Sequence, residues 1–131
     1  MKDILDLLRE PNVTIAVVGA NNNPNKYGNT IYRDLRRKGY TIFPVNPSVT
    51  EVEGDKAYAH LAALPVKPTI INFVVPPSVT LNILQECLEL GHTNVWLQPG
   101  SENDEVLNFL ETRRFNYLAN ACIMIESRVM H

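Results

Sequence analysis

The polar loop after the first apolar segment combines the residue types that bind phosphate. The stretch VVGANNNPNKYGN covers residues 17–29 and carries one cation, Lys26. A glycine directly after a buried strand permits a sharp turn, and the next helix then directs free N–H groups and its positive dipole end toward an anion. This pattern predicts a diphosphate site, although a plain strand-to-helix connection is the alternative. The candidate contacts are Gly19, Ala20, Asn21, Asn22, Lys26, Tyr27 and Gly28.

The end of the second predicted strand narrows the choice of nucleotide. An NAD site usually places an acid there for the ribose hydroxyls, but the strand ends Val45-Asn46-Pro47 and the first carboxylate is Glu51. The G-x-G-x-x-G fingerprint is also incomplete. NAD is therefore disfavoured, whereas a phosphorylated ribose, as in NADP or coenzyme A (CoA), is tolerated. No arginine stands near this strand end to hold the 2′-phosphate of NADP, which weakens the case for NADP as the ligand.

Other chemistries find little support in the sequence. His60, His92 and His131 are scattered without metal-type pairing, and neither a P-loop nor a G-x-S-x-G nucleophile motif occurs. Cys87 falls at helical spacing with the apolar residues of the predicted helix 78–90 and is expected in the core. Cys122 follows the last predicted strand, where a mixed disulfide with a thiol ligand is chemically feasible, but no lysine or histidine lies close in sequence to activate it. We expect binding rather than catalysis.

Bulk composition restricts the class of protein. The chain has 131 residues, a net charge of −2 and a pI near 5.9, which fits one domain over residues 1–131 and argues against nucleic-acid or membrane-surface binding. No apolar run reaches the length of a membrane span. Two cysteines do not form a disulfide framework, so we expect a cytoplasmic protein.

Apolar periodicity predicts an α/β fold. Five strand-like runs alternate with helical segments, which is typical of an open, parallel, Rossmann-like sheet with helices on both faces. We expect the strand order 3-2-1-4-5, with a helix in residues 1–11 and a tail at 121–131. The predicted strands cover residues 13–19, 40–45, 69–75, 94–98 and 116–120, and the main helices cover 30–38, 78–90 and a segment opened by a capping box at Ser101 and Asp104.

Ligands of such sheets bind at the carboxyl ends of the strands. At this edge the third strand is followed by Val74, Val75, Pro76 and Pro77, and the fourth by Gln98 and Gly100. Trp96 lies mid-strand and is expected in the core.

Six motifs in register resemble the small, single-domain CoA-binding proteins, which are relatives of the CoA-binding domain of the succinyl-CoA synthetase α subunit. These motifs are VVGA with its loop, GYTIFPVNP, EVEGDKAY, VVPP, VWLQPG and NACIMIE. The resemblance implies that Gly19, Ala20, Asn21 and Lys26 hold the CoA diphosphate. It also implies that Val45, Asn46 and Pro47 face the ribose phosphate. Many members of that family have a basic residue where this chain has Ser48, and Lys56 and Lys26 are the two possible substitutes. Val74, Val75, Pro76 and Pro77 would pack on the adenine, and Gln98 would line the pantetheine arm.

The resulting expectation is a binder of CoA or acyl-CoA with a carrier, sensor or regulatory role. One alternative is an NAD(P)-dependent oxidoreductase, and another is a protein-interaction module with a vestigial nucleotide pocket. A small-molecule ligand is the expected partner, and exposed sheet edges are compatible with a homodimer.

Overall fold

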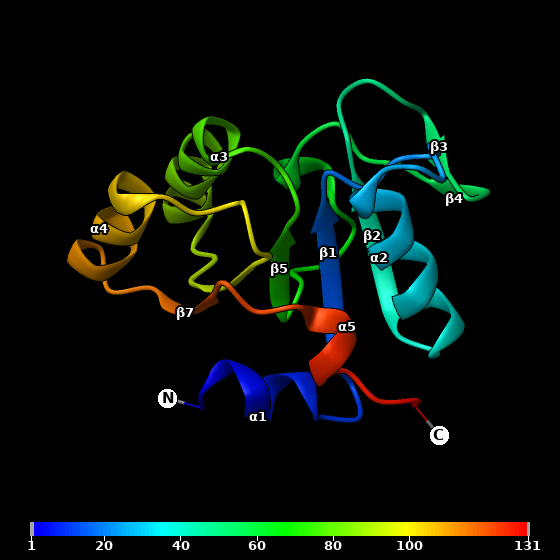
Figure 1. The fold of residues 1–131 in the computed structure, drawn as a ribbon, viewed down its shortest axis with the longest axis horizontal. Helices are drawn as coiled ribbons and strands as arrows, with labels where there is room; N and C mark the ends of the chain where they lie inside the picture. Colours follow the sequence, from blue (N-terminus) through cyan, green and yellow to red (C-terminus); the bar gives the residue numbers. More distant parts are fainter. Residues whose placement is uncertain (1, 131) are drawn as a thin grey trace.

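The protein is described here by a computed structural model that covers residues 2–130, so Met1 and His131 lie outside the described residues. Helices pack on both faces of a five-stranded parallel sheet, which confirms the Rossmann-like α/β fold (Figure 1). The strands are β1 (Thr14–Val18), β2 (Thr41–Val45), β5 (Ile70–Phe73), β6 (Asn94–Leu97) and β7 (Asn116–Ala119).

The strand order corrects the sequence-based expectation of 3-2-1-4-5. The sheet runs β2-β1-β5-β6-β7, so the third long strand lies in the middle and the second at the edge. Residues 70–73 are all buried, as a central strand requires. β2 contains Pro44, which has no N–H to donate to a ladder and is therefore tolerated at a sheet edge. The order reverses between β1 and β5, which places the ligand-binding crevice of this fold between their carboxyl ends.

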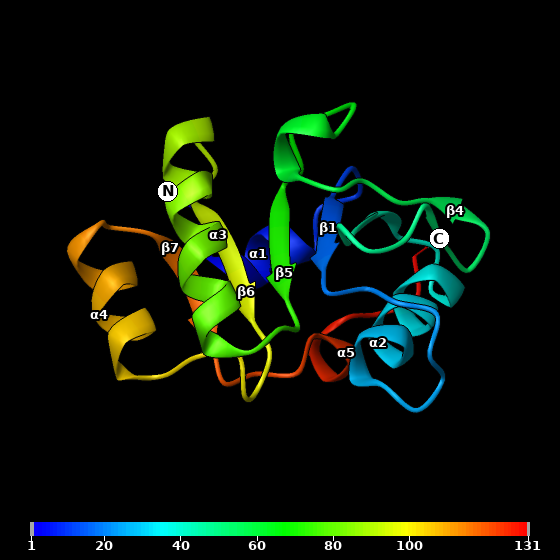
Figure 2. The ribbon, with the colours of Figure 1, turned by 90° about the horizontal axis from the view of Figure 1, so that it is seen from above.

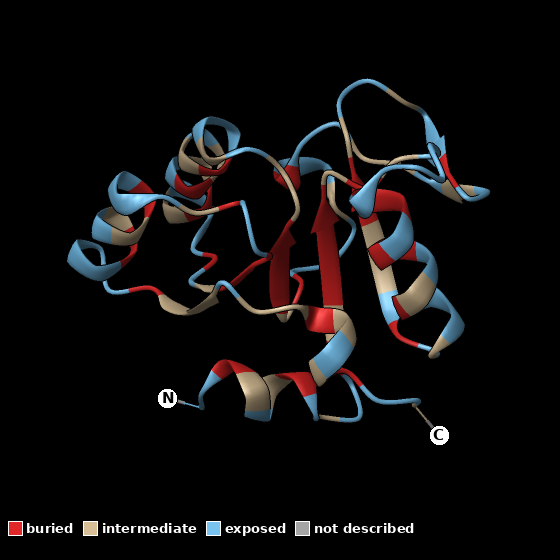
Figure 3. Cartoon of the chain, viewed as in Figure 1, coloured by how far each residue is buried: buried red, intermediate tan, exposed pale blue. Residues whose placement is uncertain are grey.

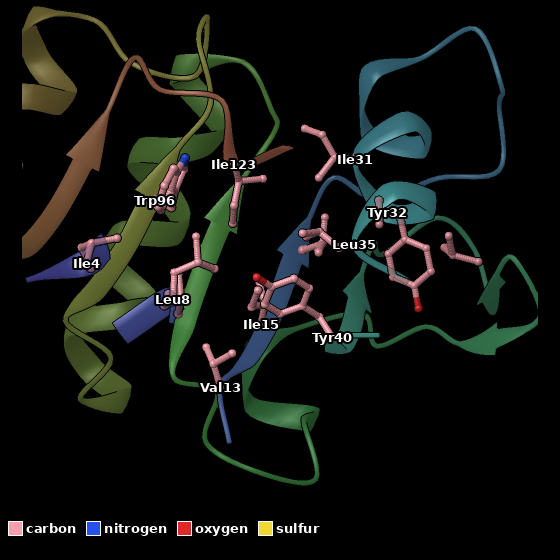
Figure 4. Close-up of a cluster of buried hydrophobic side chains, with 14 residues drawn as sticks. Ile4, Leu8, Val13, Ile15, Ile31, Tyr32, Leu35, Tyr40, Trp96 and Ile123 are labelled. Carbon is pink, nitrogen blue, oxygen red and sulfur yellow. The ribbon is translucent and has the colours of Figure 1, made fainter. Parts of the chain in front are cut away.

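Two apolar clusters hold the layers together. One face of the sheet is covered by α1 (Ile4–Leu8), α2 (Tyr27–Arg37) and α5 (Ile123–Glu126). Figure 4 shows side chains of these three helices gathered around Ile15 and the fully buried Trp96, which is a core residue as expected. The other face is covered by α3 (Pro77–Leu90) and α4 (Asp104–Thr112), which lie side by side (Figure 2).

Several elements differ from the expected ones. The polar segment after β2 contains a hairpin, β3 (Glu51–Val52) and β4 (Asp55–Lys56), followed by a 3-10 turn, η1 (Leu61–Ala63). The capping box at Ser101 is wrong: Asn103 caps α4 by accepting from the Val106 N–H, while Ser101 is buried and donates to the Phe73 carbonyl at 3.1 Å. Figure 3 shows the hairpin as mostly exposed and β1 and β5 as buried.

No helix within residues 2–130 is long and apolar enough to cross a membrane.

Candidate functional site

Two glycines allow three chain segments to meet at the carboxyl edge. Gly19 has φ of 101°, and a Cβ there would lie 2.6 Å from the Val74 carbonyl oxygen. A Cβ on Gly28 would lie 2.2 Å from the Gly19 carbonyl oxygen. Both positions therefore exclude any side chain, because the loop after β1 is pressed between the loop after β5 and the first turn of α2. The close approach at Gly28 is made by the protein's own backbone.

Asparagines hold the loop after β1 in place through hydrogen bonds within the protein. The Asn21 amide donates to the Gly19 carbonyl at 3.1 Å and its oxygen accepts from the Asn23 N–H. Asn22 donates to the Glu51 carbonyl at 2.8 Å and accepts from the Glu53 N–H at 2.9 Å. Asn22 thereby ties the loop to the β3–β4 hairpin. These asparagine amides therefore shape the loop.

A pocket of about 300 Å³ opens at the carboxyl edge on the α3 side of the sheet. Its floor is formed by Val18 and Gly19, at the end of β1. The remaining walls come from the segment after β2, the segment before η1, the loop after β5 and one face of α3. These wall residues are Val45, Asn46, Pro47, Ala59, His60, Leu61, Val75, Val79, Ile83 and Glu86. The walls are mainly apolar, with polar atoms from only a few side chains, as in sites for flat organic ligands.

The structure brings only part of the predicted site into this pocket. Gly19, Val45, Asn46, Pro47 and Val75 line it. The other candidates lie around the rim, in the core or on the opposite face; they are Ala20, Asn21, Asn22, Lys26, Tyr27, Gly28, Val74, Pro76, Pro77 and Gln98. Ala20 and Gln98 are fully buried.

Sequence reasoning missed the pocket walls from residues 59–61 and α3. Val79, Ile83 and Glu86 follow one another at spacings of four and three residues, so they share one helix face. Sequence analysis predicted a helix over residues 78–90 but placed none of these three residues in the site. The available signal was that Val79 stands in the first turn of a helix that begins at the carboxyl edge.

The lysine side chains around the site differ in the contacts that they make within the protein. Lys26 precedes α2, is exposed, and its side chain makes neither an ion pair nor a hydrogen bond among the described residues. Lys56 lies 5.3 Å above the centre of the Tyr58 ring and lines a separate hollow with Arg36. Asn46 donates to the Ala20 carbonyl at 2.9 Å and accepts from the Ser48 N–H at 2.8 Å, so its amide braces the turn. Lys26 is the cation that the loop leaves free.

A second polar cluster lies at the same edge on the α2 face. The Tyr27 hydroxyl is 2.9 Å from the Cys122 sulfur. Gln98 is buried beside them; its oxygen accepts from the Ile123 N–H at 2.9 Å, and its nitrogen has no hydrogen-bond partner among the described residues. Tyr27 is the first residue of α2, and Cys122 directly precedes α5. Figure 2 shows these two helices side by side.

This cluster changes the acidity of its members. Partial burial, followed by the contact with Cys122, raises the pKa of Tyr27 to about 12. Partial burial also opposes ionisation of Cys122, but hydrogen bonds from Tyr27 and from the Met124 and Ile125 backbone amides, together with the nearby Gln98 amide, outweigh it and lower the thiol pKa. Cys87 shows the opposite behaviour, because burial raises its pKa to about 12.

Comparison with protein families matches residues 13–128 to the CoA binding domain. The chain belongs to this CoA-binding family. The match spans nearly the whole fold, including both glycines, the pocket walls and Cys122, and it confirms the resemblance drawn from the six sequence motifs.

The chain is also similar to individual proteins of Bacillus subtilis and Pyrococcus furiosus. It is 28% identical over 115 residues to the uncharacterised protein YneT of Bacillus subtilis, covering 88% of this chain and 85% of YneT. It is 37% identical over 78 residues to the acetate–CoA ligase (ADP-forming) II subunit alpha of Pyrococcus furiosus, covering 59% of this chain but only 17% of the ligase subunit. A conserved hypothetical protein of Pyrococcus furiosus superposes with a TM-score of 0.85 at 45% identity, covering 88% of this chain and 99% of that one.

Proposed function

We propose that this chain binds CoA or an acyl-CoA at the carboxyl edge, as a carrier, sensor or regulatory protein that is not catalytic by itself. The observation that carries the proposal is the apolar pocket at the β1/β5 reversal of the strand order, in a member of the CoA-binding family. The adenine end of the ligand would enter this pocket, between Pro47 and the face of α3 formed by Val79 and Ile83.

The diphosphate would lie over the loop after β1. Lys26 supports this placement because its ammonium group is exposed and unpaired among the described residues, at the position where α2 begins. The positive end of the α2 dipole adds to the attraction for an anion. The asparagine side chains hold this loop in shape, so their contribution to binding would be preorganisation of the loop.

The end of β2 favours CoA over NAD. It carries no carboxylate to accept the two ribose hydroxyls, and the Asn46 amide is already engaged with the Ala20 carbonyl. A phosphate on the ribose would therefore meet no negative charge from this segment. The two unpaired cysteines and the reduced form of CoA both fit a reducing compartment such as the cytoplasm.

Isothermal titration calorimetry under reducing conditions tests the proposal. CoA and acetyl-CoA are expected to bind, dephospho-CoA to bind more weakly, and NAD, NADP and ATP to bind least. Lys26→Ala should weaken CoA binding by about 1.5–3 kcal/mol, roughly tenfold to a hundredfold. Lys67→Ala removes an exposed lysine away from the pocket and serves as the matched control. No heat with any CoA species would refute the proposal, and preferential binding of NADP would revive the oxidoreductase alternative.

A further inference from the structure

The cluster of Tyr27, Cys122 and Gln98 is built from three distant parts of the chain and is not needed to hold CoA in the pocket. The three residues come from the start of α2, from the segment after β7 and from the end of β6. Cys122 is half-buried and Tyr27 is 41% exposed, so a ligand can approach the sulfur. Cys87 is fully buried and offers no such access.

Gln98 supplies the observation that points to a ligand. Its side chain is completely buried, and the bond from Ile123 N–H to its oxygen fixes the orientation of the amide. The amide nitrogen is left without a hydrogen-bond partner among the described residues, although it faces the Tyr27 and Cys122 side chains closely enough to influence the ionisation of both. A buried donor without a partner lowers the stability of the fold. A polar atom arriving at Cys122 would supply the missing acceptor.

This cluster lies at the same edge as the pocket but on the other face of the sheet, where the segment after β7 returns to contact the first turn of α2. The pocket residues Val45, Gly19 and Val75 follow β2, β1 and β5, whereas Cys122 lies beside Tyr27, which directly follows Lys26 in the loop after β1. CoA is a long molecule with its nucleotide at one end and its thiol at the other. When the nucleotide fills the pocket and the diphosphate lies over the loop, the pantetheine arm is directed along this edge.

We infer that Cys122 forms a reversible mixed disulfide with CoA, with CoA disulfide as the oxidant, and this inference rests on the proposed function. The Cys122 thiolate attacks one sulfur of CoA disulfide. A Cys122–CoA disulfide bond forms, the original sulfur–sulfur bond breaks, and the second CoA leaves as a thiolate that takes a proton from water. Cys122 is oxidised and the released CoA is reduced, so electrons and atoms balance.

Tyr27 and Gln98 act as positioning residues in this exchange. The Tyr27 hydroxyl donates to the Cys122 thiolate, which keeps a larger fraction of the sulfur ionised near neutral pH. The Gln98 nitrogen is placed to donate to the incoming ligand. Thiol exchange of this kind is reversible by any reducing thiol, so the protein would report the ratio of oxidised to reduced CoA.

Intact-mass spectrometry of the reduced full-length protein incubated with CoA disulfide tests the inference. The expected product gains one CoA minus two hydrogen atoms, reverts with dithiothreitol, and maps to the Cys122 peptide in the parent protein. Cys122→Ser should abolish the adduct, while Cys87→Ser is the matched control that retains it. Because recognition of the nucleotide raises the local concentration of the disulfide, the reaction should be at least about tenfold faster than with glutathione disulfide.

The pH dependence separates a positioning role of Tyr27 from a structural one. The reaction rate should rise with a midpoint below that of a free cysteine, and Tyr27→Phe should move this midpoint to higher pH. An adduct that forms equally fast with glutathione disulfide, or that maps to Cys87, would overturn the inference. CoA binding by calorimetry without any adduct would also overturn it while leaving the proposed function intact. Absence of CoA binding under reducing conditions would instead remove the proposed function.

Discussion

The loop over residues 21–29 and the pocket wall made by α3 and residues 59–61 lie at the same edge of the sheet but are built on opposite principles. The loop is rich in polar groups, and these groups bond mainly to one another and to the β3–β4 hairpin. The wall is largely apolar and leaves its side chains open to the pocket. The comparison teaches that polar residues with the chemistry to bind a ligand can be engaged in shaping a loop, while an apolar wall nearby leaves its side chains open.

The largest expected effect concerns the crowding at Gly19. Gly19→Ala should lower the free energy of unfolding by about 3 kcal/mol, since a left-handed backbone and a close contact with Val74 both oppose the new side chain. Gly100 has φ of 93° and open space around it, so Gly100→Ala should lose only about 1 kcal/mol. Urea unfolding of both variants measures the difference. Equal losses would show that crowding at the loop is unimportant.

A smaller effect is expected when the loop is detached from the hairpin. Asn22→Ala removes two hydrogen bonds and should cost about 2 kcal/mol of stability, with weaker CoA binding because the loop is less ordered. Asn25→Ala is the control, because the Asn25 side chain makes no hydrogen bond among the described residues. Thermal unfolding and calorimetry of the two variants test this point. Unchanged CoA affinity in Asn22→Ala would contradict the preorganising role of the loop.

A substitution in the pocket wall should change the affinity for CoA but not the stability of the fold. Val79 is 38% exposed, so Val79→Asp should change the unfolding free energy by less than about 0.5 kcal/mol. A carboxylate in the apolar pocket should nevertheless weaken CoA binding by roughly tenfold, about 1.4 kcal/mol. Glu89→Asp, on the exposed side of the same helix, is the matched control. If Val79→Asp binds CoA as the parent does, the pocket does not hold the ligand.

The smallest expected effect is the change with pH in the stability contributed by Asp55, which attaches the β3–β4 hairpin to α2. Burial opposes ionisation of Asp55, but hydrogen bonds from Tyr32 and from Arg36, whose Nε lies 3.0 Å away, lower the pKa of its carboxyl. This contribution to stability is present above the unfolded pKa near about 4 and is lost as pH falls through the lower folded value. Asp55 is partly exposed, so we expect less than about 1 kcal/mol.

This contribution is measured by unfolding three proteins at pH 3 and at pH 6: the parent, Asp55→Asn and the control Glu89→Gln. Asp55→Asn should reduce the loss of stability between the two pH values, and Glu89→Gln should not.

The elements of the fold were largely predictable because buried parallel strands are continuous apolar runs. VTIAVVG and TIINFVV were identified within a few residues of β1 and β5. The strand order was not predicted, because periodicity reports burial and not neighbours. Pro44 was the overlooked signal, since a residue without an N–H favours the edge position that β2 occupies.

The site was less predictable for a different physical reason. Helical spacing places Val79 and Ile83 on an apolar face in the same way as the buried Leu84 and Cys87, so sequence alone does not separate a pocket wall from the core. The contact between Tyr27 and Cys122 joins residues 95 positions apart, and only the packing of α2 against α5 creates it. The lowered thiol pKa therefore had no local signal.

The proline in β2 also limits how copies of this protein can associate. The segment after β2 folds back on it, with the Tyr58 N–H donating to the Pro44 carbonyl and the Asn46 N–H donating to the Tyr58 carbonyl, both at 2.9 Å. The carboxyl half of that border is thus already used by the chain itself, so an additional strand would find the border beside β7 more open than the border beside β2. Because the two borders differ in this way, pairing of sheets between copies is favoured through β7, and a pair joined there offers a further copy only the partly occupied β2 borders.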